Sequence, residues 1–129
     1  MKNTLKIKRE YWPEITNEPH FIVELIYEGC NISYDDIYFS DLNNIIDKLD
    51  TLEKNRKGSV KLDGGHRFVA ILEATATGGI TIHFQAESFP PIFPGELKLK
   101  GYFIVEGEYT PIICGDLIKL FKEGKEFHI

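Results

Sequence analysis

This sequence of 129 residues lacks the short motifs that identify the common classes of catalytic and metal-binding site. It contains no nucleophile elbow, no HExxH motif, no Walker motif and no EF-hand loop. Its two cysteines, Cys30 and Cys114, have no CxxC spacing, so reduced thiols are favoured, and the sequence leaves a disulfide between them open. Four histidines fall on different predicted elements without ligand spacing, namely His20, His66, His83 and His128. We therefore expect no metal, no cofactor and no catalytic residue.

Long apolar runs and an excess of basic residues are also missing. No run approaches the ~18 apolar residues of a membrane span, and the opening MKNTLKIKRE has no apolar core of an export signal. The net charge of −5 argues against a nucleic-acid-binding protein, because such proteins usually concentrate Lys and Arg on one face. The hydrophobic content of 43% is typical of a soluble protein. We expect one domain over residues 1–129, located in the cytoplasm, with neither a membrane nor a nucleic acid as its partner.

The segment His66–Ser88 predicts a long β-hairpin, because two alternating apolar runs flank a glycine-rich turn. A three-residue loop, Thr77-Gly78-Gly79, separates the two faces best. One face is then apolar and pairs Phe68, Ala70, Leu72 and Ala74 with Ser88, Ala86, Phe84 and Ile82. The same register places Glu73 directly across from His83 on the polar face.

The remaining pattern predicts further strands and two helices around this hairpin. Alternation indicates strands over residues 4–8, 21–27, 32–39, 59–62 and 96–106. Gly101 interrupts the apolar row of the last strand, which leaves room for a helix to approach. Periodic apolar residues predict helices from Ser40 or Asp41 to about Lys54, and from Thr110 to Gly124. The simplest assembly is an α+β fold, an antiparallel sheet of about six to seven strands with two helices packed on one face.

Glu73 and His83 are the best candidates for acid–base chemistry in this pattern. A carboxylate next to an imidazole can raise its pKa and position a proton. The alternative is a cross-strand charge pair on a solvated face. We favour that alternative, because an exposed sheet face lacks the desolvation that catalysis requires.

Acidic residues are concentrated between Asp35 and Glu53. This stretch holds six acidic residues and one lysine, so its net charge equals that of the whole chain. Segregated charge of this kind is suited to steering a basic partner, such as the active-site face of a nuclease. The alternative is a solvated helix face whose acids keep the protein soluble. Because Asp is disfavoured within strands, Asp35 and Asp36 also predict an edge strand or a bulge. The candidate partner-binding residues here are Asp35, Asp36, Asp47, Asp50 and Glu53.

The segment Phe89–Gly95 is unusually apolar for a loop and contains three prolines. It forms either a lid over an open end of the core or an exposed contact for a ligand or partner. Ile92 and Phe93 are therefore further candidate partner-binding residues.

The order of these features resembles the WapI family of immunity proteins, which accompany contact-dependent, polymorphic toxins. The resemblance rests on an aromatic-proline strand end, a hairpin, the capped helix SDLNNIIDKLDTL, a β-meander, the segment QAESFPPIFPG and a closing strand and helix. It implies a small cytoplasmic bacterial protein that binds and neutralises a cognate toxin domain, often a nuclease. The family shares no catalytic motif, so no residue role is carried over.

Two hypotheses follow from the sequence. The first is a non-enzymatic, immunity-type protein with a toxin domain as its partner. The alternative is a small-molecule-binding or sequestering protein of phage or defence origin, which would use a cavity under Phe89–Pro94. The sequence identifies neither the toxin, nor the ligand, nor the oligomeric state.

Overall fold

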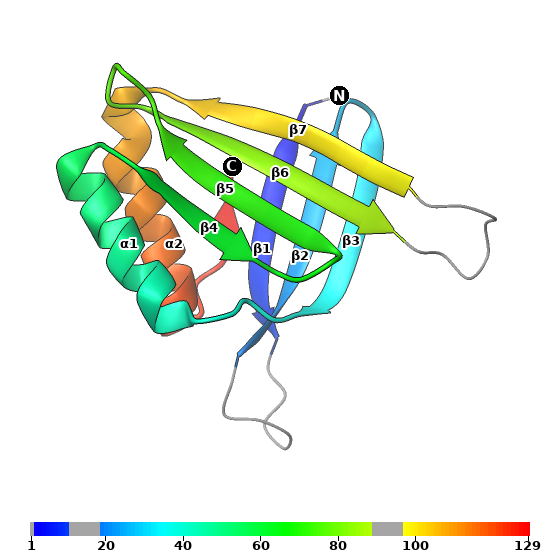
Figure 1. Ribbon diagram of the computed structural model, residues 1–129. Coiled ribbons are helices and arrows are strands. Elements are labelled where there is room, and N and C mark those ends of the chain that lie inside the picture. The colour runs from blue at the N-terminus through cyan, green and yellow to red at the C-terminus, as the bar shows by residue number, and fades with distance from the viewer. Residues whose placement is uncertain (1, 11–18, 89–96) are drawn as a thin grey trace.

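The computed structural model describes residues 2–10, 19–88 and 97–129, and it has an α+β fold (Figure 1). In these ranges, eight strands form two antiparallel sheets of four, with the orders β3-β2-β1-β8 and β4-β5-β6-β7. The predicted α+β class with two helices is confirmed, and the strands are divided between two sheets. The first sheet contains β1 (Thr4–Glu10), β2 (His20–Tyr27), β3 (Cys30–Ile37) and β8 (Phe127–His128). The second contains β4 (Ser59–Asp63), β5 (Phe68–Ala74), β6 (Ile80–Ser88) and β7 (Leu97–Val105). The helices are α1 (Leu42–Asn55) and α2 (Thr110–Glu123), and a short 3-10 turn, Gly107–Tyr109, precedes α2.

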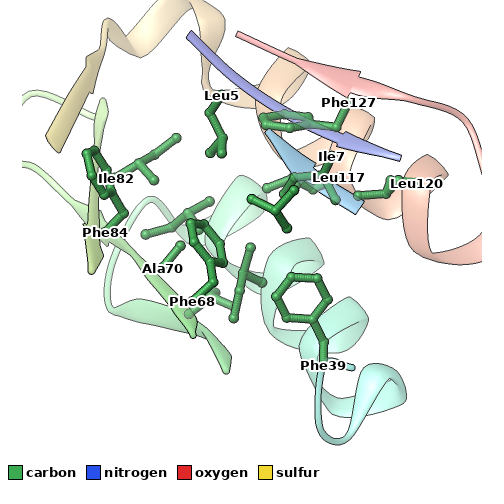
Figure 2. Packing of buried hydrophobic residues seen from close by; sticks show 14 of the residues in the cluster. Leu5, Ile7, Phe39, Phe68, Ala70, Ile82, Phe84, Leu117, Leu120 and Phe127 are labelled. Carbon is green, nitrogen blue, oxygen red and sulfur yellow. The ribbon is translucent and has the colours of Figure 1, made fainter. Parts of the chain in front are cut away.

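The core lies between the two sheets and is closed on one side by the helices, which lie next to each other (Figure 1). Figure 2 shows side chains from both sheets and from α2 meeting there, and Phe39 enters from the connection between β3 and α1. Each strand contributes alternate residues because successive side chains of a strand point to opposite faces. An aromatic cluster joins the first sheet to α2, with the ring of Phe39 at 5.4 Å from Phe21 and 5.8 Å from Phe121.

The central hairpin has the predicted faces and a loop of the predicted length, but its register differs by two residues. Phe68 pairs with Ala86 rather than with Ser88. The loop is Ala76-Thr77-Gly78, since the Thr75 N–H donates to the Gly79 carbonyl oxygen across it. Gly78 supplies the left-handed residue at the end of the loop, with φ 83°. A shift of two residues preserves which side chains face the core, and the hydrophobic pattern alone therefore could not detect it.

The first sheet confirms both expectations for Asp35 and Asp36. The strand β3 is an edge strand, and its pairing with β2 shifts between the Phe21–Ile37 and Val23–Tyr34 pairs. The extra residue forms a β-bulge, in which Asp36 is left-handed with φ 58°. Asp tolerates this conformation better than most residues do.

The helix ends differ in how they are capped. Asp41 precedes α1 in a left-handed conformation with φ 59°, and its side chain makes no capping hydrogen bond. The expected side-chain cap is therefore absent, although α1 begins at the expected place. Gly124 ends α2 with φ 74°, as the sequence predicts. Beyond it, Phe127 pairs with Ile7 in β8 and is buried, so the end of the chain is anchored to the first sheet.

Candidate functional site

The acidic residues of the predicted partner-binding stretch differ in how far the fold engages them. Asp35 and Asp47 are exposed, and their carboxylates have no ion-pair or hydrogen-bond partner in the described part of the chain. Asp41, which precedes α1, is exposed in the same way. The other three predicted residues, Asp36, Asp50 and Glu53, are either paired or partly covered.

Asp36 lies in a polar cluster at the bulge of β3. One of its carboxylate oxygens lies 2.6 Å from His20 Nδ1, so the two form an ion pair whenever the imidazole is protonated. Arg67 Nη2 donates to the Asp36 carbonyl oxygen at 2.7 Å, and the Asp36 N–H donates to the Glu10 carboxylate. The His20 ring lies 5.7 Å from the ring of Tyr38. These contacts hold the bulge in place, and Asp36 therefore contributes less free charge to the surface than the sequence predicts.

Within α1, a lysine just beyond the predicted stretch reduces the negative charge. Lys54 Nζ lies 2.8 Å from a carboxylate oxygen of Asp50, one helical turn away. This hydrogen bond and the Asp50 charge raise the pKa of Lys54 above its ordinary value. Glu53 is half-buried, and its carbonyl oxygen accepts a hydrogen bond from Arg56 Nε at 2.8 Å. The accessible negative charge of α1 is therefore concentrated near its start, at Asp41 and Asp47.

A pocket of about 750 Å³ opens next to these two residues. Its lining residues include members of the connection from β3 to α1, of α1 itself and of the end of α2, and Figure 1 shows these segments next to one another. Its apolar lining comes from Phe39, Leu42, Ile46 and Phe121. Charged lining residues come from three elements, with Asp41 and Asp47 at α1, Arg9 on β1 and Lys122 on α2.

Sequence reasoning did not find this pocket. Leu42 and Ile46 belong to the apolar stripe whose periodicity predicts the first helix, yet they are only half-buried and line the opening. Their positions at the edge of the stripe were the one available signal. Nothing in the sequence places Arg9 and Lys122 together, because they come from distant segments. Ile92 and Phe93 lie outside the described residues, so their predicted role stays a prediction.

Glu73 and His83 do not face each other, because of the register of the hairpin. Glu73 pairs with Thr81, while His83 lies between Ile71 on β5 and Tyr102 on β7. The prediction that these two side chains lie directly opposite each other was wrong. The turn closes one residue earlier than the sequence suggested, and this moves each partner by two positions.

The outer face of the second sheet holds a further, smaller pocket of about 510 Å³. His66, His83 and Gln85 line it, together with Glu87. Glu87 accepts a hydrogen bond from Gln85 Nε2 at 2.8 Å and lies 3.7 Å from Lys98 Nζ. Nowhere in the described ranges do three or more His, Cys, Asp or Glu side chains come together in a way that could hold a metal ion.

Both cysteines are free thiols in the structure. Cys114 is fully buried in α2, and its burial raises the pKa of the thiol to about 11. The Glu53 carboxylate adds to this increase in the pKa, and the Arg56 guanidinium opposes it. Cys30, at the start of β3, is half-buried. Because only the thiolate is strongly nucleophilic, Cys114 is chemically inert in the folded protein.

Comparisons of the chain with family models, with curated proteins and with solved structures found no match. Within the residues that the structure describes, neither helix has the length and apolar content needed to cross a membrane.

Proposed function

We propose that this chain is a non-enzymatic, immunity-type protein, which binds a cognate toxin domain in the cytoplasm and neutralises it. The observation that carries this proposal is a set of exposed carboxylates, those of Asp35, Asp41 and Asp47, which have no ion-pair partner among the described residues. They belong to the stretch whose charge equals the net charge of the chain. The resemblance to the WapI family supports the same function.

The chemistry of such a surface favours a basic partner. Exposed carboxylates attract Lys and Arg over several ångströms in water, and this increases the rate of productive encounters. A nuclease toxin carries basic residues where it binds the phosphates of its substrate. A partner that covers those residues blocks substrate access without doing any chemistry of its own.

The test is co-purification from the native strain, with this chain as bait and mass spectrometry as the readout. We expect a secreted toxin to be recovered, and co-expression of this chain to protect cells from the isolated toxin domain. Recovery of no toxin, or a toxin whose effect on growth is unchanged by co-expression, would contradict the proposal. A toxin gene adjacent to the gene for this chain would provide independent support.

The pocket next to α1 favours a second candidate, a protein that binds or sequesters a small molecule. Its volume of about 750 Å³ lies within the ordinary range of ligand pockets. The cavity predicted under Phe89–Pro94 involves residues outside the described ranges. Thermal unfolding in the presence of a metabolite library separates the two functions. A small molecule that raises the midpoint supports sequestration, because a ligand stabilises the state that it binds.

A further inference from the structure

The pocket next to α1 has the arrangement of an anchor site for a protein partner. Its apolar base is rigid, because Phe39 and Phe121 are buried and their rings are in contact at 5.8 Å. Leu42 and Ile46 follow each other by one helical turn and leave part of their surface open to the pocket. At the edge of the pocket, Tyr38 is 39% exposed to solvent. These groups form a preformed apolar surface that solvent reaches.

The polar residues that line the pocket are more accessible to solvent than its aromatic base. Asp41, Asn43, Asp47 and Lys122 are exposed, and Arg9 is half-buried. Sites for small molecules usually place a few convergent polar groups deep in the cavity, where they orient the ligand. An apolar centre with a polar, accessible rim is instead the anatomy of a protein–protein interface. The lining therefore favours a side chain presented by another protein.

The charges of the rim are divided between its two sides. Asp41 and Asp47 lie on the α1 side, and neither carboxylate has an ion-pair partner in the described residues. Arg9 and Lys122 lie on the β1 and α2 side, and the described part of the chain offers neither an ion pair. A partner's lysine or arginine is thus favoured next to α1 and disfavoured on the other side.

We propose that this pocket receives a large apolar side chain of the toxin, and that a lysine or arginine next to that side chain pairs with Asp41 or Asp47. This inference rests on the proposed function and names the anchor of the same interface. Large side chains that fill a pocket at the centre of an interface supply most of its binding energy. The neighbouring ion pair sets the direction in which the partner segment crosses the pocket.

The probe for this proposal is a phage-displayed library of random dodecapeptides, selected on the folded protein. We expect the selected peptides to carry Phe, Trp, Leu, Ile or Met close to a single Lys or Arg. Affinity is then measured with synthetic peptides by fluorescence polarisation. Two variants test the site. Asn43→Trp adds a bulky side chain at the rim, and Asp47→Lys reverses one of its negative charges.

Each variant has a matched control outside the pocket. Asn44→Trp places the same side chain at the adjacent exposed position, and Glu106→Lys reverses an exposed carboxylate that lies outside both the pocket and the acidic stretch and has no ion pair within the described residues. We expect Asn43→Trp and Asp47→Lys to weaken peptide binding by about tenfold or more, and each control by less than about twofold. Circular dichroism establishes that all four variants fold.

Three results would overturn the proposal: no peptide enriched, enriched peptides without the apolar–basic pair, or equal binding by Asn43→Trp and the parent protein. The result of this test is independent of the result of the co-purification test of the proposed function. A recovered toxin that binds the Asn43→Trp variant normally would remove the anchor site and leave the immunity function intact. Conversely, peptides that bind in the pocket when no toxin is recovered would support the anchor site and contradict the immunity function.

Discussion

Arg56 Nη1 donates a hydrogen bond of 2.9 Å to the carbonyl oxygen of Gly78, across 22 positions of the chain. The same nitrogen lies 3.0 Å from the Gly107 carbonyl oxygen, and Arg56 Nε donates to the Glu53 carbonyl oxygen at 2.8 Å. Gly78 also accepts a hydrogen bond from Thr110 Oγ1 at 2.8 Å. One guanidinium therefore connects the end of α1, the turn of the central hairpin and the start of the 3-10 turn.

We predict that Arg56→Ala lowers the free energy of unfolding by about 2–4 kcal/mol, because charge-assisted hydrogen bonds to partly buried carbonyls are lost. Arg56 is also left-handed, with φ 54°. Arg56→Gly loses the same bonds but relieves this strain, so it should cost about 1 kcal/mol less than Arg56→Ala. Urea titration measures both values.

The control for these two variants is Lys57→Ala, at the next position, which is exposed. It should change stability by less than about 0.5 kcal/mol. If Arg56→Ala has as small an effect as Lys57→Ala, the guanidinium does not hold the three segments together.

Two glycines should respond in opposite directions to the same substitution. A Cβ added at Gly101 would lie 2.4 Å from Tyr27 Cε1 and 2.5 Å from Phe84 Cζ. Gly101→Ala should therefore destabilise the protein by about 1–3 kcal/mol, because the Tyr27 and Phe84 rings must move to admit the methyl group. Gly115 lies inside α2, and a Cβ there would meet no atom within 4 Å. Gly115→Ala should stabilise the protein by about 0.5–1 kcal/mol.

Thermal and denaturant unfolding of the two variants provides the comparison. Destabilisation by Gly115→Ala would contradict the open space next to α2. No effect of Gly101→Ala would contradict the close packing of Tyr27 against β7.

Local sequence pattern was sufficient for the elements of the fold but not for their assembly. Periodicity identified both helices and seven of the eight strands in the described residues, because each of these elements buries one face; β8, Phe127–His128, is too short to show a period. The pattern did not reveal that Gly101 makes room for Tyr27 of the opposite sheet, since that contact joins segments more than 70 positions apart. We had expected a helix at that position. The division of the strands into two sheets could not be predicted for a similar reason. Alternation shows which face of a strand is buried, but it does not show which element covers that face.

The candidate site was only partly predictable, because local sequence pattern does not report tertiary contacts. The sequence located the acidic stretch, and the bulge at Asp35 and Asp36 follows from the poor fit of Asp in a strand. It did not reveal that His20 and Lys54 engage two of the acids. Nor could it bring Arg9 and Lys122 to the pocket, because tertiary packing alone places them there.

Stability at alkaline pH should depend on Cys114. Burial raises the pKa of this thiol from 9.0 to about 11, so the folded state retains a proton that the unfolded state releases. The contribution of this thiol to stability is complete below pH 9 and is lost as the pH rises towards 11. The difference in unfolding free energy between the parent protein and Cys114→Ala should therefore decrease over this interval. A constant difference would show that the thiol has the same pKa in both states.

The two cysteines should also differ in labelling by a thiol reagent at mildly alkaline pH. In the folded protein, we expect one thiol to react, that of half-buried Cys30. Denaturant should expose the second. Rapid labelling of both thiols without denaturant would contradict the burial of Cys114.

The last prediction concerns Asp47 and Asp50, which the sequence treats alike and the structure separates. Asp47 is exposed without an ion-pair partner in the described residues, whereas Asp50 lies 2.8 Å from Lys54 Nζ. If the acidic surface steers a basic toxin domain, Asp47→Lys should slow association more than Asp50→Lys does, because Lys54 already offsets part of the Asp50 charge. We expect Asp47→Lys to reduce the association rate constant by about threefold to tenfold at low ionic strength. The deficit should shrink at physiological salt, where charges are screened over about 8 Å.

Lys48→Glu is the matched control for Asp47→Lys, because it changes the charge in the opposite direction at the adjacent exposed position. It should accelerate association at low salt and leave the dissociation rate constant nearly unchanged, since steering acts before contact. Stopped-flow fluorescence with the purified toxin domain measures both constants. An on-rate that is the same for Asp47→Lys, Lys48→Glu and the parent protein at low salt would mean that the acids of α1 only keep the protein soluble. A change confined to the dissociation rate would remove the steering role of Asp47 and leave only its proposed direct contact with the toxin.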